Sequence, residues 1–143
     1  MPGSIIHFAH ANGFPALSYG DFLDRLKSDN DVIHKNLLAH DQRYPVNEGW
    51  RNSADEIIQF IEETAYRPVV GVGHSFGATI TLIAASKRPE LFESLVLLDP
   101  VIVVGFLPSS VGKVLRRFDM LGNITPADRS AVRKKDWKSR EEA

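Results

Sequence analysis

The stretch Gly73-His74-Ser75-Phe76-Gly77 decides the fold, because it follows a short apolar run at residues 68–72 and precedes a helical segment at 78–87. A serine on a sharp strand-to-helix turn has a strained backbone and is crowded by its neighbours two positions away, which favours glycine at both positions. With average glycine and serine usage, a G-x-S-x-G string alone occurs by chance in about one chain in twenty of this length. The flanking strand and helix make this string predict a nucleophile elbow.

The composition is that of one ordinary globular domain. The chain has 143 residues, of which 43% are hydrophobic and 24% charged, and its 17 basic and 18 acidic residues leave a net charge of -1. Such a balance provides no basic field for nucleic acid. The lack of cysteine excludes disulfides, thiol catalysis and thiolate metal sites, and it suits a reducing compartment. Because we find neither a signal-peptide pattern nor an apolar run of about 18 residues, we expect a cytoplasmic protein with no membrane span.

Four apolar β-type runs alternate with amphipathic segments of helical period. We expect strands at residues 4–9, 32–39, 68–72 and 95–98, and helices at 16–28, from 53 onward and at 78–87. Ser53 and Glu56 match a capping box that would open the second helix, and the run at 95–98 is typical of a parallel strand buried on both faces. This order predicts a three-layer αβα architecture with a mostly parallel sheet of about four strands.

Several polar residues follow the predicted strands directly. Ser75, Asp99 and the loop that begins at His10 each come after the carboxyl end of a strand. Since the carboxyl ends of parallel strands share one edge of a sheet, and ligands bind at that edge, we expect these residues to form the functional site.

Four stretches resemble the α/β-hydrolase family, and specifically its small ester-type serine hydrolases. They are residues 6–15 (IHFAHANGFP), the elbow at 73–77, residues 94–100 and residues 137–143. The resemblance covers essentially the whole chain. It implies that Ser75 is the nucleophile and that the backbone N–H groups of Phe76 and Asn12 form an oxyanion hole. It also implies a small ester-type substrate and neither cofactor nor metal.

The implied chemistry has an independent physical basis. Acyl transfer builds negative charge on a carbonyl oxygen, and a preorganised N–H donor at a helix N-terminus stabilises that charge by about 3 kcal/mol. Phe76, the first residue after the serine, is placed for this role. We expect His10, Phe14 and His74, which adjoin these positions, to contact the substrate.

The catalytic base and acid are less well defined. The family's order is serine, then acid, then histidine, but no histidine follows His74 in this chain. Asp99 is a candidate acid, or a carboxylate that caps the turn before Pro100. His10 is a candidate substitute base, or a residue that holds the oxyanion loop through backbone hydrogen bonds. We expect no metal site among the four histidines at 7, 10, 34 and 40, because their spacing does not converge ligands.

The last residues of the sequence carry a signal for the start of a helix, but too few residues follow it to form one. Residues 139–142 (SREE) form another capping box, and the chain stops one residue later. We therefore expect the N-terminal half of a hydrolase, with residues 1–100 forming part of an incomplete α/β-hydrolase core and 101–143 beginning a lid. The alternative is a catalytically silent fragment or a pseudo-hydrolase that binds a small ligand. A half-sheet with an open edge would also favour self-association.

Overall fold

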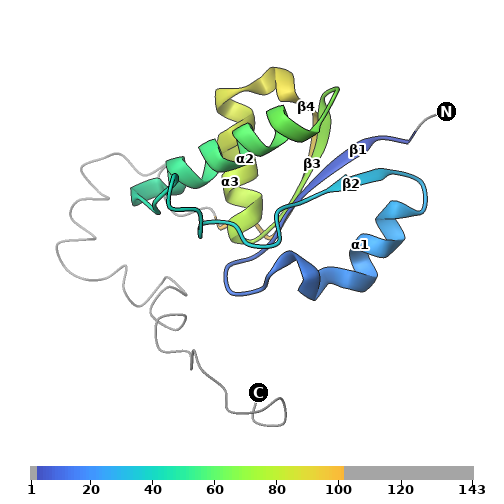
Figure 1. Cartoon of the computed structure of the whole chain (residues 1–143), viewed down its shortest axis with the longest axis horizontal. Helices are drawn as coiled ribbons and strands as arrows, with labels where there is room; N and C mark the ends of the chain where they lie inside the picture. Colours follow the sequence, from blue (N-terminus) through green and yellow to red (C-terminus); the bar gives the residue numbers. More distant parts are fainter. Residues whose placement is uncertain (1–2, 102–143) are drawn as a thin grey trace, which may run out of the picture. The chain divides into compact units, whose positions relative to one another are not determined.

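The computed structural model describes residues 3–101. Four strands, β1 (Ile5–Ala9), β2 (Asp31–Ile33), β3 (Val69–His74) and β4 (Phe92–Leu98), alternate with three α-helices, α1 (Gly20–Lys27), α2 (Arg51–Thr64) and α3 (Phe76–Lys87). Short 3-10 turns lie at η1 (Ala16–Tyr19), η2 (Glu48–Trp50) and η3 (Pro89–Leu91). The strands pair in the order β2-β1-β3-β4, and every pair is parallel, which confirms the predicted sheet (Figure 1).

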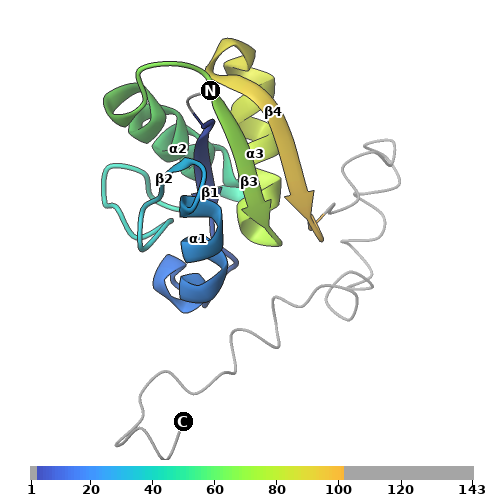
Figure 2. The same cartoon turned by 90° about the vertical axis from the view of Figure 1, so that its right-hand side faces the viewer.

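The helices cover the two faces of the sheet unequally. Helices α2 and α3 lie on one face and α1 lies on the other (Figure 2). Side chains of β1 alternate between these faces, so Ile5 and Ala9 join the core cluster under α2 and α3, whereas Ile6 and Phe8 join the cluster under α1. All five residues of β1 are buried, as expected of an inner strand with helices on both sides.

The second strand is shorter than predicted. Strand β2 ends at Ile33, and the expected continuation through residues 37–39 is wrong. Ala39 has φ 64°, a left-handed conformation that a strand does not contain. Leu38 is nevertheless buried in the core cluster under α2 and α3, so the apolar character of this segment reflects a loop that packs on the core.

The capping box predicted at the start of the second helix is also wrong. Helix α2 begins at Arg51, and Ser53 lies buried inside its first turn, where its hydroxyl has no hydrogen-bond partner among residues 3–101. Glu56 does not reach back to the helix start. Its carboxylate accepts hydrogen bonds from Lys35 Nζ at 2.6 Å and from the Ala39 N–H at 2.9 Å.

Strand β4 is not buried on both faces, contrary to the prediction. Helix α3 packs on one side, but Val96 and Leu98 are 45% and 41% exposed. Figure 2 shows α1 over β1 and β2, and within residues 3–101 no helix covers β4 on that side. The predicted lid and the capping box at 139–142 lie outside the described residues. None of the helices in the described part of the chain has the length and apolar character needed to cross a membrane.

Candidate active site

Ser75 occupies the sharp turn that the sequence predicts between a strand and a helix. Strand β3 ends at His74, α3 begins at Phe76, and Ser75 between them has φ 53° and ψ -116°. A residue with a side chain in this conformation is strained by about 1–3 kcal/mol, and such strain is concentrated at functional sites. The side chain of Ser75 is only partly buried.

The two glycines of the elbow stand where no side chain fits. A Cβ on Gly73 would lie 2.5 Å from the Cα of Ala78, and a Cβ on Gly77 would lie 2.1 Å from the carbonyl oxygen of Ala9. The crowding expected around the serine is therefore present, and at Gly77 the crowding group is the end of β1. This contact places the first turn of α3 directly against the strand that leads into the His10 loop.

Phe76 is held beside the elbow by an aromatic neighbour, Trp50. Its ring is buried and meets Trp50 edge to face, with ring centroids 5.2 Å apart. Trp50 precedes α2 with φ 54° and packs against the core cluster. A single sequence contains no signal for this contact, because the two residues lie 26 positions apart. The N–H groups of the first helical turn have no partner within the helix, so the N-terminus of α3 offers donors at this edge of the sheet.

The loop after β1 forms the turn that its Asn-Gly pair predicts. The Phe14 N–H donates to the carbonyl of Ala11 at 3.1 Å, and Gly13 has φ 77°, which suits the third position of a type II turn. Asn12 is exposed on this turn, and the ring of Phe14 is 49% exposed. The loop thus presents an amide-bearing residue and an apolar ring to solvent.

His10 is buried, and backbone groups occupy both of its ring nitrogens. The Leu38 N–H donates to Nε2 at 2.8 Å, so Nδ1 carries the proton and donates to the carbonyl of Ala11 at 2.8 Å. Burial lowers the pKa of this ring and favours the neutral form that the two bonds require. A role as a base, or a polar contact with substrate, would need a ring nitrogen that this arrangement does not leave free.

His74 points toward Tyr19 and is engaged there. Its Nδ1 lies 2.8 Å from the Tyr19 hydroxyl, and the two rings meet edge to face with centroids 5.8 Å apart. Tyr19 also accepts a hydrogen bond from the Ala11 N–H at 3.2 Å. Residue type and spacing give no signal for Tyr19, which lies inside the predicted helix at 16–28 and, in the structure, just before α1.

Asp99 lies at the same edge of the sheet as Ser75. The Ser75 N–H donates to the carbonyl of Leu98 at 2.9 Å, which joins the elbow to the end of β4. Asp99 follows with φ 47° and is exposed. Within residues 3–101, which include every histidine of the chain, no hydrogen bond joins Ser75 or Asp99 to a histidine ring. The two residues are therefore neighbours at the rim without forming a triad.

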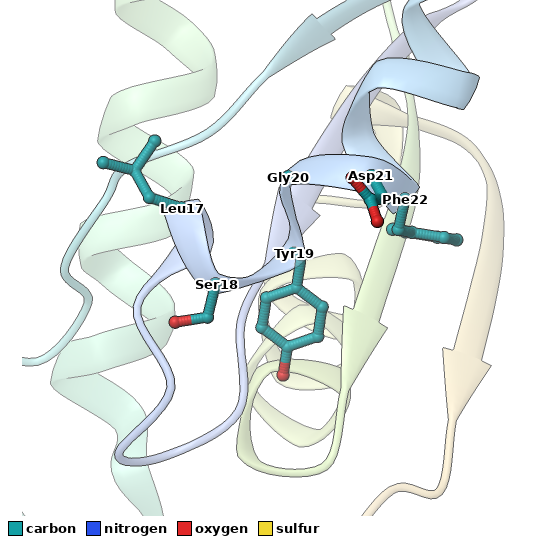
Figure 3. A pocket seen from close by; sticks show the side chains of 6 residues that line it. All are labelled: Leu17, Ser18, Tyr19, Gly20, Asp21 and Phe22. Atoms are coloured by element: carbon teal, nitrogen blue, oxygen red, sulfur yellow. The ribbon is translucent and has the colours of Figure 1, made fainter. Parts of the chain in front are cut away.

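A shallow hollow of about 490 Å³ lies along η1 and the start of α1 (Figure 3). Its walls come from one continuous segment, residues 17–22, and Leu17 and Phe22 lie at its two ends (Figure 3). No group of three His, Cys, Asp or Glu side chains in the described part of the chain could hold a metal ion.

Comparisons with known proteins agree with this arrangement. A sequence profile of the alpha/beta hydrolase family matches residues 8–142. The type I acyl-CoA thioesterase mpaH of Penicillium brevicompactum is 32% identical over 163 residues, which cover 100% of this chain and 35% of that protein. The monoglyceride lipase of Rattus norvegicus is 27% identical over 126 residues, which cover 80% of this chain and 40% of that protein. The chain thus spans about a third of the length of the first of these relatives.

The fold also matches solved structures. The thioesterase domain from the curacin biosynthetic pathway superposes with a TM-score of 0.60 at 20% identity, over 86% of this chain and 47% of that one. At this identity the match concerns the fold alone. It agrees with a four-stranded parallel sheet that corresponds to part of an alpha/beta hydrolase fold.

Proposed function

The chain belongs to the alpha/beta hydrolase family, and from that premise we propose that it acts as a serine hydrolase on a small carboxylic ester or a related acyl substrate, through an acyl-enzyme on Ser75. The observation that carries the proposal is the geometry of Ser75. A non-glycine residue at φ 53° stands between a buried parallel strand and a helix N-terminus, with Gly77 pressed against the end of β1. Such strain has little structural use unless the side chain must project from the turn.

In the proposed reaction the Ser75 oxygen attacks the carbonyl carbon of the substrate. The carbonyl π electrons move to the oxygen, and the resulting oxyanion accepts hydrogen bonds from the N–H groups of Phe76 and Asn12. A base takes the proton of the Ser75 hydroxyl during the attack. When the intermediate collapses, the bond to the leaving oxygen or sulfur breaks, this atom receives that proton, and the alcohol or thiol leaves; water then hydrolyses the acyl-serine to the carboxylic acid and free Ser75. Each oxyanion donor would contribute about 3 kcal/mol to the transition state. The exposed ring of Phe14 is the proposed apolar contact for the acyl group.

Two relatives support the substrate class. One is named an acyl-CoA thioesterase and the other a monoglyceride lipase, and both names describe cleavage of an acyl bond. We extend this to an ester or thioester with a modest acyl group, since the exposed side chain of Leu98, whose carbonyl accepts a hydrogen bond from the Ser75 N–H, suits an acyl chain better than a charged group. The predicted contacts of His10, Phe14 and His74 with substrate belong to this proposal, as does the oxyanion role of Asn12; a polar contact from His10 would require release of one of its two backbone-bonded ring nitrogens.

A catalytically silent chain that binds a small ligand is the second candidate. One specific observation favours it, because no histidine ring nitrogen in residues 3–101 hydrogen-bonds the Ser75 hydroxyl. Loss of the base from a serine triad lowers kcat by about a millionfold in the best-measured case. The hydrolase proposal therefore needs a base that the described residues do not place beside Ser75.

A fluorophosphonate probe separates the two candidates. The chain and its Ser75→Ala variant are incubated with the probe, and the labelled peptide is identified by mass spectrometry. We expect labelling of Ser75 in the first protein and none in the second. Turnover of p-nitrophenyl esters and of short acyl thioesters then defines the substrate class. Equal labelling of both proteins, or none of either, would refute a reactive Ser75 in this chain.

A further inference from the structure

The hydroxyl of Tyr19 joins two backbone segments that lie far apart in the sequence. It accepts a hydrogen bond from the Ala11 N–H at 3.2 Å, and it lies 2.8 Å from Nδ1 of His74. Ala11 immediately precedes Asn12, and His74 immediately precedes Ser75. One oxygen atom thus connects the loop that carries a proposed oxyanion donor with the turn that carries the proposed nucleophile.

The direction of one of the two bonds follows from the donors available. The backbone nitrogen of Ala11 can only donate, so Tyr19 accepts there. The bond to His74 has two arrangements: the Tyr19 hydroxyl donates to Nδ1, or the protonated Nδ1 donates to the second lone pair of Tyr19. In either arrangement the one oxygen atom stays bonded to both segments.

The ring of Tyr19 is held in place by packing against a core residue. It meets Phe8 of β1 edge to face with centroids 4.9 Å apart, and Phe8 is fully buried. Figure 3 shows the Tyr19 side chain pointing away from its own short helical turn, toward the end of β3. Phe8 and the end of β3 belong to adjacent strands, so these contacts fix the position of the Tyr19 hydroxyl relative to the sheet.

The Asn12 loop is held from two sides. On one side His10 joins Ala11 to Leu38, and on the other side Tyr19 joins Ala11 to the elbow. Of these two connections only the second contacts the residue next to Ser75.

We propose that Tyr19 is a positioning residue that sets the separation between the Asn12 amide and the Ser75 hydroxyl, and so the geometry of the oxyanion hole. This inference rests on the proposed function. Tyr19 does not touch the reacting atoms, and it acts through Ala11 and His74. Loss of its hydroxyl leaves the Ala11 N–H without its partner and releases the loop from the elbow, while the ring and its packing remain.

The test uses the Tyr19→Phe variant of the whole chain, which removes one oxygen. Tyr66→Phe is the matched control, because Tyr66 is 76% exposed and, within residues 3–101, its hydroxyl hydrogen-bonds the side chain of Asp31 alone. We expect Tyr19→Phe to reduce the rate of fluorophosphonate labelling about tenfold, and to speed amide hydrogen exchange at Ala11 and Asn12 about fivefold, in line with one lost hydrogen bond. The control should change neither rate.

Nuclear magnetic resonance supplies a readout that does not need catalysis. The ring nitrogen shifts of His74 should show a hydrogen bond at Nδ1 in the starting protein, and the Nδ1 shift should change in Tyr19→Phe. If the starting protein is not labelled at all, the proposed function fails, while exchange and ring shifts still decide the role of Tyr19.

A purely structural role would give a different pattern. It would lower the midpoint of urea unfolding but leave the Asn12 amide exchange, the His74 ring shifts and the labelling rate of the folded protein at their starting values. That result would overturn the inference.

Discussion

The backbone N–H of Ser75 donates a hydrogen bond to the carbonyl of Leu98 at 2.9 Å, so the strained serine is joined to the last residue of β4. The next residue, Asp99, has φ 47°, and Ser75 has φ 53°. Two residues with side chains therefore take up left-handed backbone conformations at the ends of adjacent strands. Strain of this kind is found where a binding or catalytic edge is built, and it makes both positions sensitive to substitution.

Asp99 is expected to act through its backbone conformation. Asparagine tolerates a positive φ and keeps the side-chain shape, so the unfolding free energy of Asp99→Asn should stay within about 0.5 kcal/mol of that of the starting protein. Asp99→Ala should lower the unfolding free energy by about 1 kcal/mol. Urea unfolding measures both. Fluorophosphonate labelling should stay within about twofold in Asp99→Asn. A loss of several orders of magnitude, typical of a triad acid, would instead identify Asp99 as that acid.

Gly77 is expected to tolerate no side chain. A Cβ there would lie 2.1 Å from the Ala9 carbonyl oxygen, which is backbone and has no room to move, so Gly77→Ala should cost more than about 3 kcal/mol or abolish folding. Gly20→Ala is the matched control, since a Cβ at Gly20 meets nothing within 4 Å and its φ of -46° is helical. The control should be neutral or stabilising by up to about 1 kcal/mol. Similar losses for both variants, measured by thermal unfolding, would contradict this account of the elbow.

Glu56 is expected to be the most sensitive charged residue of α2. Its side chain is fully buried and holds Lys35 and the Ala39 N–H, so Glu56→Ala leaves the amide unpaired and leaves the partly buried Lys35 ammonium with only its longer contact to Asp41, at 3.5 Å, within residues 3–101. We expect a cost of about 3 kcal/mol in urea unfolding. Asp55→Ala on the same helix removes an exposed pair with Lys87 and should cost less than about 1 kcal/mol. Equal costs would show that burial of Glu56 does not matter.

His7 is expected to make stability depend on pH. It is fully buried on β1, both of its ring nitrogens lack partners within residues 3–101, and burial together with His34 lowers its pKa to about 3. The folded state therefore holds the neutral ring, while the unfolded state takes up a proton below about pH 6.5. The free energy of unfolding is therefore unaffected above that pH. It decreases by about 1.4 kcal/mol per pH unit as the pH falls toward 3, so the loss at pH 5 is about 2 kcal/mol.

The His7→Leu variant isolates this contribution. Burial also lowers the pKa of His10 and His34, so both proteins should lose stability in acid. The difference between their urea-unfolding free energies should nevertheless shift by about 2 kcal/mol, in favour of the variant, between pH 7 and pH 5. A difference that stays constant over this range would show that His7 is protonated in the folded protein.

Self-association through β4 stays a prediction. Val96 and Leu98 lie on the same face of this strand and are 45% and 41% exposed, which offers an apolar strip to a second copy. We expect sedimentation velocity to show association that weakens in a Val96→Lys, Leu98→Lys double variant. Leu17→Lys is the control, because Leu17 is 70% exposed and lies on η1, outside β4. If Leu17→Lys weakens the association as much as the double variant does, the association depends on overall surface hydrophobicity and not on β4.

The sequence predicts correctly those features that depend on near neighbours along the chain. The two glycines around Ser75 indicate a backbone with no room for Cβ atoms, and the structure has this turn where the G-x-S-x-G pattern at 73–77 predicts it. The apolar periodicity likewise predicts the parallel sheet, because alternation between strand and helix constrains how the faces can be buried.

The three wrong predictions all concern partners that lie far away in the sequence. Ser53 and Glu56 have the spacing of a capping box, but the Glu56 carboxylate accepts hydrogen bonds from Lys35 and from the Ala39 N–H instead. The apolar segment at 37–39 buries Leu38 from a loop, and the apolar run of β4 has one exposed side. For the first two, the group that meets the side chain comes from another element; for β4, the described part of the chain provides no helix on the second face.

What the sequence by itself determined is the kinked serine at 75, the parallel order of strands and the edge at which a site would form, since local sterics and hydrophobic period govern these. Only the tertiary structure decided that Tyr19 joins Ala11 to His74, that His10 is occupied by backbone groups and that Trp50 packs on Phe76. These contacts join residues between 8 and 55 positions apart through single hydrogen bonds and ring edges. Such interactions are too specific in direction and distance for any pattern of residue types to encode, so they exist only once the sheet has brought its edges together.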